Sequence, residues 1–234
     1  DMYDMVDGSS PFAQYGATGA PIYNDATNAP AINIASGYND SKPWTTRDPR
    51  LSATVLYNGV AWGNGTINVV LGQRDNPIGN TNATPTGYYV RKYIPETILS
   101  AEHSQSAYRL WTFIRYAEIL LNYAEALNEA QTAPSQEIYD MLDMVRHRAG
   151  ISGSVANRSD LTSSKENMRN FIHKERTIEL AFEEHRAWDV RRWNVAVEAL
   201  SRPIYGVNVS SDGTITRKVA QKRVFENKMY LYPI

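Results

Sequence analysis

The second half of the chain has apolar residues at helical spacing. Between residues 111 and 130 (WTFIRYAEILLNYAEALNEA) they recur every three or four positions, and the pattern continues over residues 135–150 (SQEIYDMLDMVRHRAG). Gly150 is a typical helix stop. Ser163, with Glu166 three residues later, has capping-box spacing and predicts a third helix over residues 164–194. Two helices joined by a short break form a hairpin of the tetratricopeptide-like kind, which needs neighbours to cover both of its faces.

The first half has a different pattern. Residues 1–100 hold 10 of the 14 Gly and 8 of the 11 Pro, and these residue types interrupt periodic elements. Alternating or continuous apolar residues predict three short strands, over residues 50–59, 67–72 and 87–94. The stretches 8–46 and 73–86 are expected to be long loops, and loops of that length are usually functional or mobile. Near the C-terminus, Asp212-Gly213 lies between YGVNV and TITRKV and predicts a hairpin.

These patterns predict a mainly α protein, in which helical hairpins form a scaffold and a loop-rich segment with short strands packs on it. We divide the chain into a loop-rich ligand-binding segment, residues 1–100, and a helical scaffold with the C-terminal hairpin, residues 101–234.

Composition and charge exclude several function classes. The net charge is −1, from 24 basic and 25 acidic residues, so no basic footprint favours nucleic acid. Cysteine is absent, and the four His lack the spacing of zinc ligands, so we expect no metal site and no cofactor. No apolar run approaches the ~18 residues of a membrane span.

The stretch 173–194 (HKERTIELAFEEHRAWDVRRWN) is the strongest candidate for chemistry. Glu183 and Asp189 are six residues apart on the expected helix and point in different directions, and no nucleophile accompanies them. Pairing at i,i+3 would instead join oppositely charged residues, and arginines of neighbouring helices would cover the glutamates. The candidate pairs are Arg176–Glu179, Glu183–Arg186 and Asp189–Arg192, and the candidate covering residues are Arg115, Arg146 and Arg148. We therefore interpret this stretch as a structural ion network and expect no catalysis.

Five segments in order resemble the SusD/RagB family of Bacteroidetes outer-membrane lipoproteins. They are RDPRL (47–51) with RKY (91–93), RYAEILLNYAEAL (115–127), VRHRAGI (145–151), ERTIELAFEEHRAWDVRRW (175–193) and YLYPI (230–234). The resemblance covers almost the whole chain. RDPR on its own could bind an anion through its two arginines, but the preferred interpretation is that Asp48 and Pro49 shape the entry to a strand and that the arginines pair with nearby carboxylates.

The resemblance implies a cell-surface protein without enzymatic activity. Members of this family lie on the extracellular face of the outer membrane, capture oligosaccharides or polysaccharides, and deliver them to a TonB-dependent, SusC-like transporter. Other members capture peptides, and a helical-repeat scaffold that binds only protein is a further alternative. The family's chains are roughly twice as long, and their N-terminal half carries the lipid anchor and further helices. We therefore expect this chain to be the C-terminal portion, attached to the membrane only through an anchor outside it.

Aromatic residues in the loop-rich half are the predicted ligand platform. Flat rings match the C–H faces of sugars, while amides, carboxylates and arginines bind their hydroxyls. The alternative is that these rings fix long loops to the core. The candidates are Tyr38, Trp44, Tyr57, Trp62, Arg74, Asp75 and Asn76.

Overall fold

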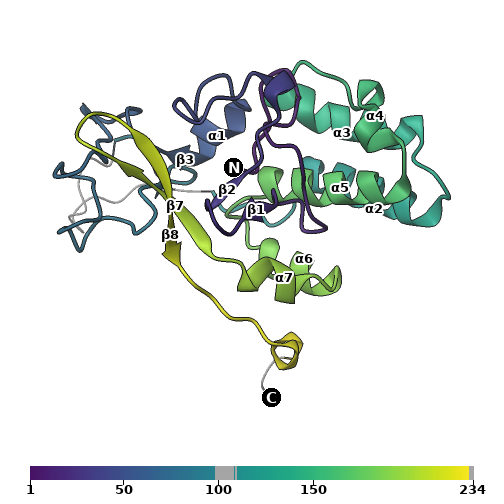
Figure 1. Ribbon diagram of the computed structural model, residues 1–234. Helices are drawn as coiled ribbons and strands as arrows, with labels where there is room; N and C mark the ends of the chain where they lie inside the picture. Colours follow the sequence, from purple (N-terminus) through teal and green to yellow (C-terminus); the bar gives the residue numbers. More distant parts are fainter. Residues whose placement is uncertain (98–107, 109, 232–234) are drawn as a thin grey trace.

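Most helices gather on one side of the molecule, and the loops of residues 57–88 lie on the other with the C-terminal hairpin (Figure 1). The structure, a computed structural model, describes residues 1–97, 108 and 110–231. The α-helices are α1 (Pro49–Thr54), α2 (Tyr116–Ala130), α3 (Gln136–Ala149), α4 (Ser159–Thr162), α5 (Lys165–Glu179), α6 (Arg186–Arg192) and α7 (Ala196–Ser201). The strands are β1 (Tyr23–Asn24), β2 (Ala29–Pro30), β3 (Val55–Leu56), β4 (Ala61–Trp62), β5 (Gly65–Thr66), β6 (Tyr89–Val90), β7 (Ile204–Val209) and β8 (Ile215–Gln221). Short 3-10 helices cover Ile34–Ser36, Val155–Asn157 and Asn227–Tyr230.

Helices α2, α3 and α5 pack together around the main apolar core. Its innermost side chains are fully buried and come from all three helices: Leu121, Ala124, Ile138, Leu142, Met168 and Ile172. The predicted hairpin of α2 and α3 is confirmed, and Gly150 ends α3 in the left-handed conformation with φ 94°. α2 begins later than predicted, because Arg115 is extended rather than helical.

The prediction of one helix over residues 164–194 is wrong. The cap of α5 is Ser164 and not Ser163, and its side chain accepts a hydrogen bond from the Asn167 amide. The helix then ends at Glu179, and Phe182 and Glu184 both have positive φ, which an α-helix does not allow. The chain turns there and starts again as α6. Phe182 and Trp188, which one continuous helix would have placed near its charged face, are 50% and 62% exposed.

The strand prediction for residues 50–59 is also wrong in its first part. Asp48 accepts a hydrogen bond from the Arg50 amide, and Pro49 occupies the first helical position, so residues 49–54 form α1. Only Val55–Leu56 is extended, and it pairs with Tyr89–Val90, the part of 87–94 that is a strand. The stretch 67–72 does not form a regular strand and contributes a single parallel bridge from Val70 to Val209.

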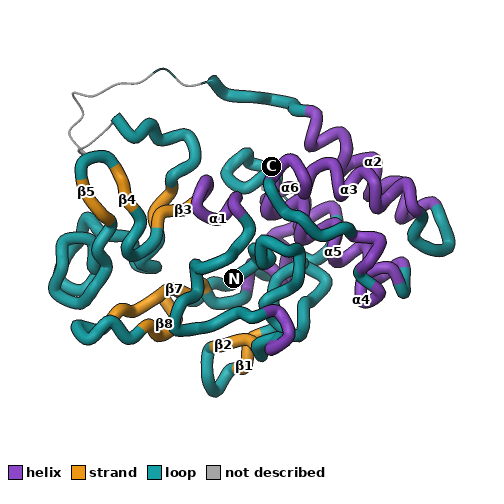
Figure 2. The backbone as a smooth tube through the Cα atoms, turned by 90° about the horizontal axis from the view of Figure 1, so that it is seen from above, coloured by secondary structure: helices purple, strands orange, loops and turns teal. Residues whose placement is uncertain are grey.

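The loop-rich side is organised by several short strand pairs. β3 pairs with β6, β4 with β5, and the predicted C-terminal hairpin of β7 and β8 is present. Figure 2 shows β3, β4 and β5 together at the end opposite α2, α3 and α4. A second apolar cluster lies here, around Leu56, Ile67, Val69, Val207 and Val209. This cluster supports the loops that carry the predicted ligand residues.

Candidate functional site

Buried ion pairs fasten the loop-rich side to the helices. Arg50 of α1 contacts Glu175 and Glu179 of α5 at 2.6 and 2.9 Å. Arg146 of α3 contacts the second oxygen of Glu175 at 2.9 Å, and the Glu175 side chain is 0% exposed. In RDPR, Arg47 donates to backbone carbonyl groups and not to a carboxylate, and both arginines are buried. RDPR therefore has a structural role, with carboxylate partners for Arg50, but it leads into helix α1 and not into a strand.

The predicted covering of the glutamates is confirmed and has two additional members. Arg115 contacts both Glu179 and Glu183, and Arg148 contacts Glu179 at 2.7 Å. Lys92, which the sequence analysis did not name, contacts Glu183 at 2.6 Å, and Arg50 is the other addition. Burial favours a raised pKa for the Glu179 carboxyl, but hydrogen bonds and charge from Arg115 and Arg50 lower this pKa below its ordinary value.

Two of the three predicted i,i+3 pairs are wrong. Asp189 and Arg192 do pair, at 2.9 Å. Arg176 contacts Asp189 at 2.8 Å and not Glu179, and Arg186 donates to the Thr177 hydroxyl at 2.8 Å. The break after α5 explains the missing Glu183–Arg186 pair, whereas Arg176 and Glu179 both lie in α5 and pair with residues of other segments. Glu175, Glu179, Glu183 and Asp189 nevertheless have cationic partners, as expected for a structural network.

A groove in the loop-rich side brings together three of the predicted ligand residues, Trp62, Arg74 and Asp75. It has a volume of about 750 Å³, within the range of small-molecule sites. The half-buried Trp62 ring is placed on the groove by the tight pairing of β4 with β5, in which Trp62 faces Gly65. The other lining residues are Leu56, Asn64, Gly65, Ile67, Asn80, Asn82, Ala83, Tyr89, Val90 and Ile94.

The chemistry of the groove combines an apolar floor with an amide-rich rim. Leu56 and Ile67 are buried below, and Asn64 and Asn82 are exposed. Arg74 and Asp75 are the charged residues that line the groove, and they pair with each other at 2.9 Å. Their charges therefore cancel.

The Asp75 carboxyl is also held by the backbone. Its Oδ2 accepts a hydrogen bond from the Asn68 amide at 2.8 Å. Burial favours a raised pKa for this carboxyl, but the bonds from Arg74 and Asn68 lower the pKa below its ordinary value. Asp75 is therefore an ionised acceptor at neutral pH.

The remaining four predicted residues do not line this groove. Trp44 and Tyr57 stack on each other with ring centroids 5.0 Å apart and 15° between the planes. The Tyr38 side chain is buried and accepts a hydrogen bond from Arg217 at 2.8 Å. Asn76 is 2% exposed and donates to the Val69 carbonyl at 2.6 Å. Tyr38 and Asn76 therefore use their polar atoms within the fold.

The sequence analysis missed four of the polar and aromatic residues that line the groove. Asn64 and Asn82 lie in turns, Asn80 lies between two turns, and Tyr89 lies on β6 and donates to the Asp75 carbonyl at 2.8 Å. The concentration of Asn in residues 64–82 was a visible signal. The pairing of β3 with β6, which brings Tyr89 to the groove, is a long-range contact without a local signal.

The described residues contain neither a cluster of metal ligands nor a membrane-spanning helix. No group of three or more His, Cys, Asp or Glu in this part of the chain is arranged to hold a metal ion. Among the same residues, no helix has the length and apolar character needed to cross a bilayer.

One protein family matches the chain over its full length, and individual relatives match part of it. The model of the SusD family matches residues 1–234. SusD-like protein P2 of Formosa agariphila is 32% identical over 112 residues, which are 47% of this chain and 22% of that protein. SusD-like protein P38 of the same organism is 35% identical over 97 residues, which are 40% of this chain and 18% of that protein.

Solved structures agree with this fold. A SusD-like protein from Bacteroides fragilis superposes with a TM-score of 0.75 at 28% identity, over 99% of this chain and 41% of its own. A SusD-like carbohydrate binding protein from the same organism gives 0.71 at 30% identity, over 100% and 44%. The chain therefore spans less than half the length of these relatives.

Proposed function

The chain belongs to the SusD family, and we propose that it captures oligosaccharides in the groove beside Trp62 and delivers them to a TonB-dependent, SusC-like transporter. In this proposal the whole protein lies on the extracellular face of the outer membrane and is held by a lipid anchor outside this chain. It binds its ligand without cleaving it. One relative of similar fold is described as carbohydrate binding, which supports the ligand class.

The single observation that carries the proposal is the combination of side chains in the groove. Sugars present C–H faces and hydroxyl groups together, and the groove offers the Trp62 and Tyr89 rings beside three asparagine amides. The pairing of Arg74 with Asp75 leaves the lining without net charge, which suits an uncharged ligand. An open groove buries little of its ligand, so weak single-site binding is expected, and a polysaccharide that engages several proteins would bind more tightly.

Calorimetry on Trp62→Ala tests the proposed site. Loss of one stacking ring should weaken oligosaccharide binding about tenfold, or ~1.4 kcal/mol. Trp188→Ala is the matched control, because Trp188 is an exposed tryptophan on α6 that does not line the groove. Circular dichroism should show both variants folded. Equal affinity of Trp62→Ala and wild type would exclude the groove as the glycan site.

Two further measurements address the rest of the proposal. Purification of the full-length protein from outer membranes should recover a TonB-dependent transporter with it, and recovery without one would argue against delivery. Incubation with polysaccharide should release no reducing ends above a heat-killed control, and such release would contradict binding without cleavage.

A further inference from the structure

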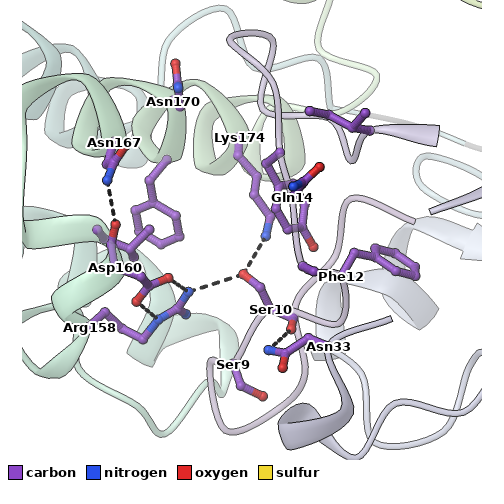
Figure 3. A pocket seen from close by; sticks show the side chains of 15 residues that line it. Ser9, Ser10, Phe12, Gln14, Asn33, Arg158, Asp160, Asn167, Asn170 and Lys174 are labelled. Atoms are coloured by element: carbon purple, nitrogen blue, oxygen red, sulfur yellow. Dashed lines mark hydrogen bonds and ion pairs between the residues drawn. The ribbon is translucent and has the colours of Figure 1, made fainter. Parts of the chain in front are cut away.

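A cavity separate from the groove beside Trp62 lies between the N-terminal segment and helices α4 and α5 (Figure 3). Its volume is about 810 Å³, and it shares no lining residue with the groove beside Trp62. From the N-terminal side it is lined by residues between Ser9 and Asn33, and from the helical side by residues between Arg158 and Lys174. None of these residues was among the predicted ligand residues.

The walls of this cavity are fixed by contacts between the two sides. Lys174 and Arg158 reach from the helical side to the Ser10 hydroxyl, at 3.4 and 3.3 Å (Figure 3). Asn33 donates to the Ser10 carbonyl at 2.9 Å, and Arg158 also donates to the Gly8 carbonyl. The cavity is therefore held open by the fold itself, as a preformed binding site requires.

The charges around the cavity cancel. Arg158 pairs with Asp160 at 2.6 Å, and Lys174 pairs with the buried carboxylate of Asp4. These partners account for each charged side chain that lines the cavity. An ionic ligand would have to displace one of them, so an uncharged ligand is favoured.

Hydrogen-bonding groups remain available at the cavity. The side chains of Gln14 and Asn170 form no hydrogen bond within the described part of the chain, and Gln14 is exposed. Asn167 donates from Nδ2 to the Asp160 carbonyl at 2.9 Å, which leaves its Oδ1 as an acceptor. Apolar surface accompanies these amides and comes from Ala13, Tyr15, Ile22, Leu161 and Phe171.

We infer that this cavity is a second glycan-binding site, which takes an uncharged sugar unit through the amides of Gln14 and Asn167 and the apolar wall around Phe171. The choice of a glycan as ligand rests on the proposed function, whereas the location and the neutrality rest on this cavity alone. Two separate sites on one chain would allow a long glycan, or two glycans, to be held at once and would raise the effective affinity for polysaccharide.

Ala13→Trp tests the second site. Ala13 is exposed at the cavity and uses only its backbone amide, which donates to the Ala31 carbonyl, so a large side chain there should fill the cavity without breaking a contact. Gln14→Ala is a milder variant and should weaken this site about fivefold, the loss typical of one neutral hydrogen bond. Ala126→Trp on α2 is the matched control, because Ala126 is exposed and lines neither hollow.

Calorimetry with maltohexaose, cellohexaose and mannohexaose provides the measurement, and a melting curve checks that each variant is folded. Wild type and Ala126→Trp should bind at two sites with at least one of these sugars. Trp62→Ala should weaken only the groove site and leave the cavity site unchanged, whereas Ala13→Trp should block only the cavity site and leave the groove site unchanged.

The outcomes separate the two sites. One site in wild type that Trp62→Ala removes would overturn the second site and leave the proposed function intact. Binding that survives Trp62→Ala unchanged, but is lost in Ala13→Trp and weakened in Gln14→Ala, would overturn the groove and keep the second site. Absence of binding to all three sugars would overturn both.

Discussion

Removal of the Glu175 carboxylate should destabilise the fold strongly. This side chain is 0% exposed, with one oxygen 2.6 Å from Arg50 and the other 2.9 Å from Arg146. In Glu175→Ala both guanidinium groups stay buried and lose this partner. Removing one member of a buried ion pair typically costs about 3–5 kcal/mol, because the remaining charge is not solvated.

The remaining partners place the expected cost at the lower end of that range. Arg50 keeps Asp48 and Glu179, and Arg146 keeps Asp4. We expect a loss of about 3 kcal/mol in the free energy of unfolding. Glu129→Ala is the control, since Glu129 and its partner Arg169 are 43% and 36% exposed, and such pairs contribute about 0–1 kcal/mol.

Urea unfolding followed by circular dichroism measures both variants. The transition midpoint should fall steeply for Glu175→Ala with little change in the denaturant slope, because the surface exposed on unfolding is nearly the same. Glu175→Gln, which keeps the shape and removes the charge, separates electrostatics from packing. Glu175→Ala within about 1 kcal/mol of wild type, as for the surface control, would refute the claim that buried pairing holds the two sides together.

Two further perturbations test the same interface. Glu179 and Glu183 have carboxyl pKa values held below the ordinary 4.5, so their stabilising contribution is complete above that pH and is lost as the pH falls through the folded-state pKa. Thermal melting from pH 7 to 3 should therefore show the melting temperature falling below about pH 4.5, and falling less in Glu179→Gln, measured against its own value at pH 7. A melting temperature that does not change with pH would contradict this contribution. Gly19→Ala should destabilise the fold by about 1–3 kcal/mol, because Gly19 has φ 71° and an added Cβ would lie 2.5 Å from the Lys174 Cα. Gly59→Ala controls for backbone strain alone, because Gly59 has φ 85° but open space around it. A melting temperature of Gly19→Ala equal to that of wild type would show that the loop moves freely.

Local sequence signals predicted the elements whose contacts are local. α3 follows its apolar spacing from Gln136 to Ala149, and the turn at Asp212-Gly213 closes the β7–β8 hairpin as expected. Residues 50–59 were predicted as a strand because their apolar residues alternate, although the residues just before them carry a helix-capping signal. Asp48-Pro49 is a good helix start in its own right, and it would have predicted α1.

The candidate groove was only partly predictable, because distant segments build it. Trp62, Arg74 and Asp75 are close in sequence and were identified from composition, whereas Tyr89 arrives through the pairing of β3 with β6. The break after α5 had no clear signal either. Positive φ at Phe182 and Glu184 lets Glu183 reach Arg115 and Lys92, and those partners lie far away in the sequence.

The ion network also limits how this sequence can change. Arg50, Arg146, Glu175 and Glu179 share partners, so substitutions among them should be non-additive by about 0.5–3 kcal/mol. A first substitution leaves a buried charge unmatched, and a second can relieve that cost by removing the stranded partner. Stable variants should therefore differ at two or more of these positions together. A protein with a replacement at only one of them would be a destabilised intermediate.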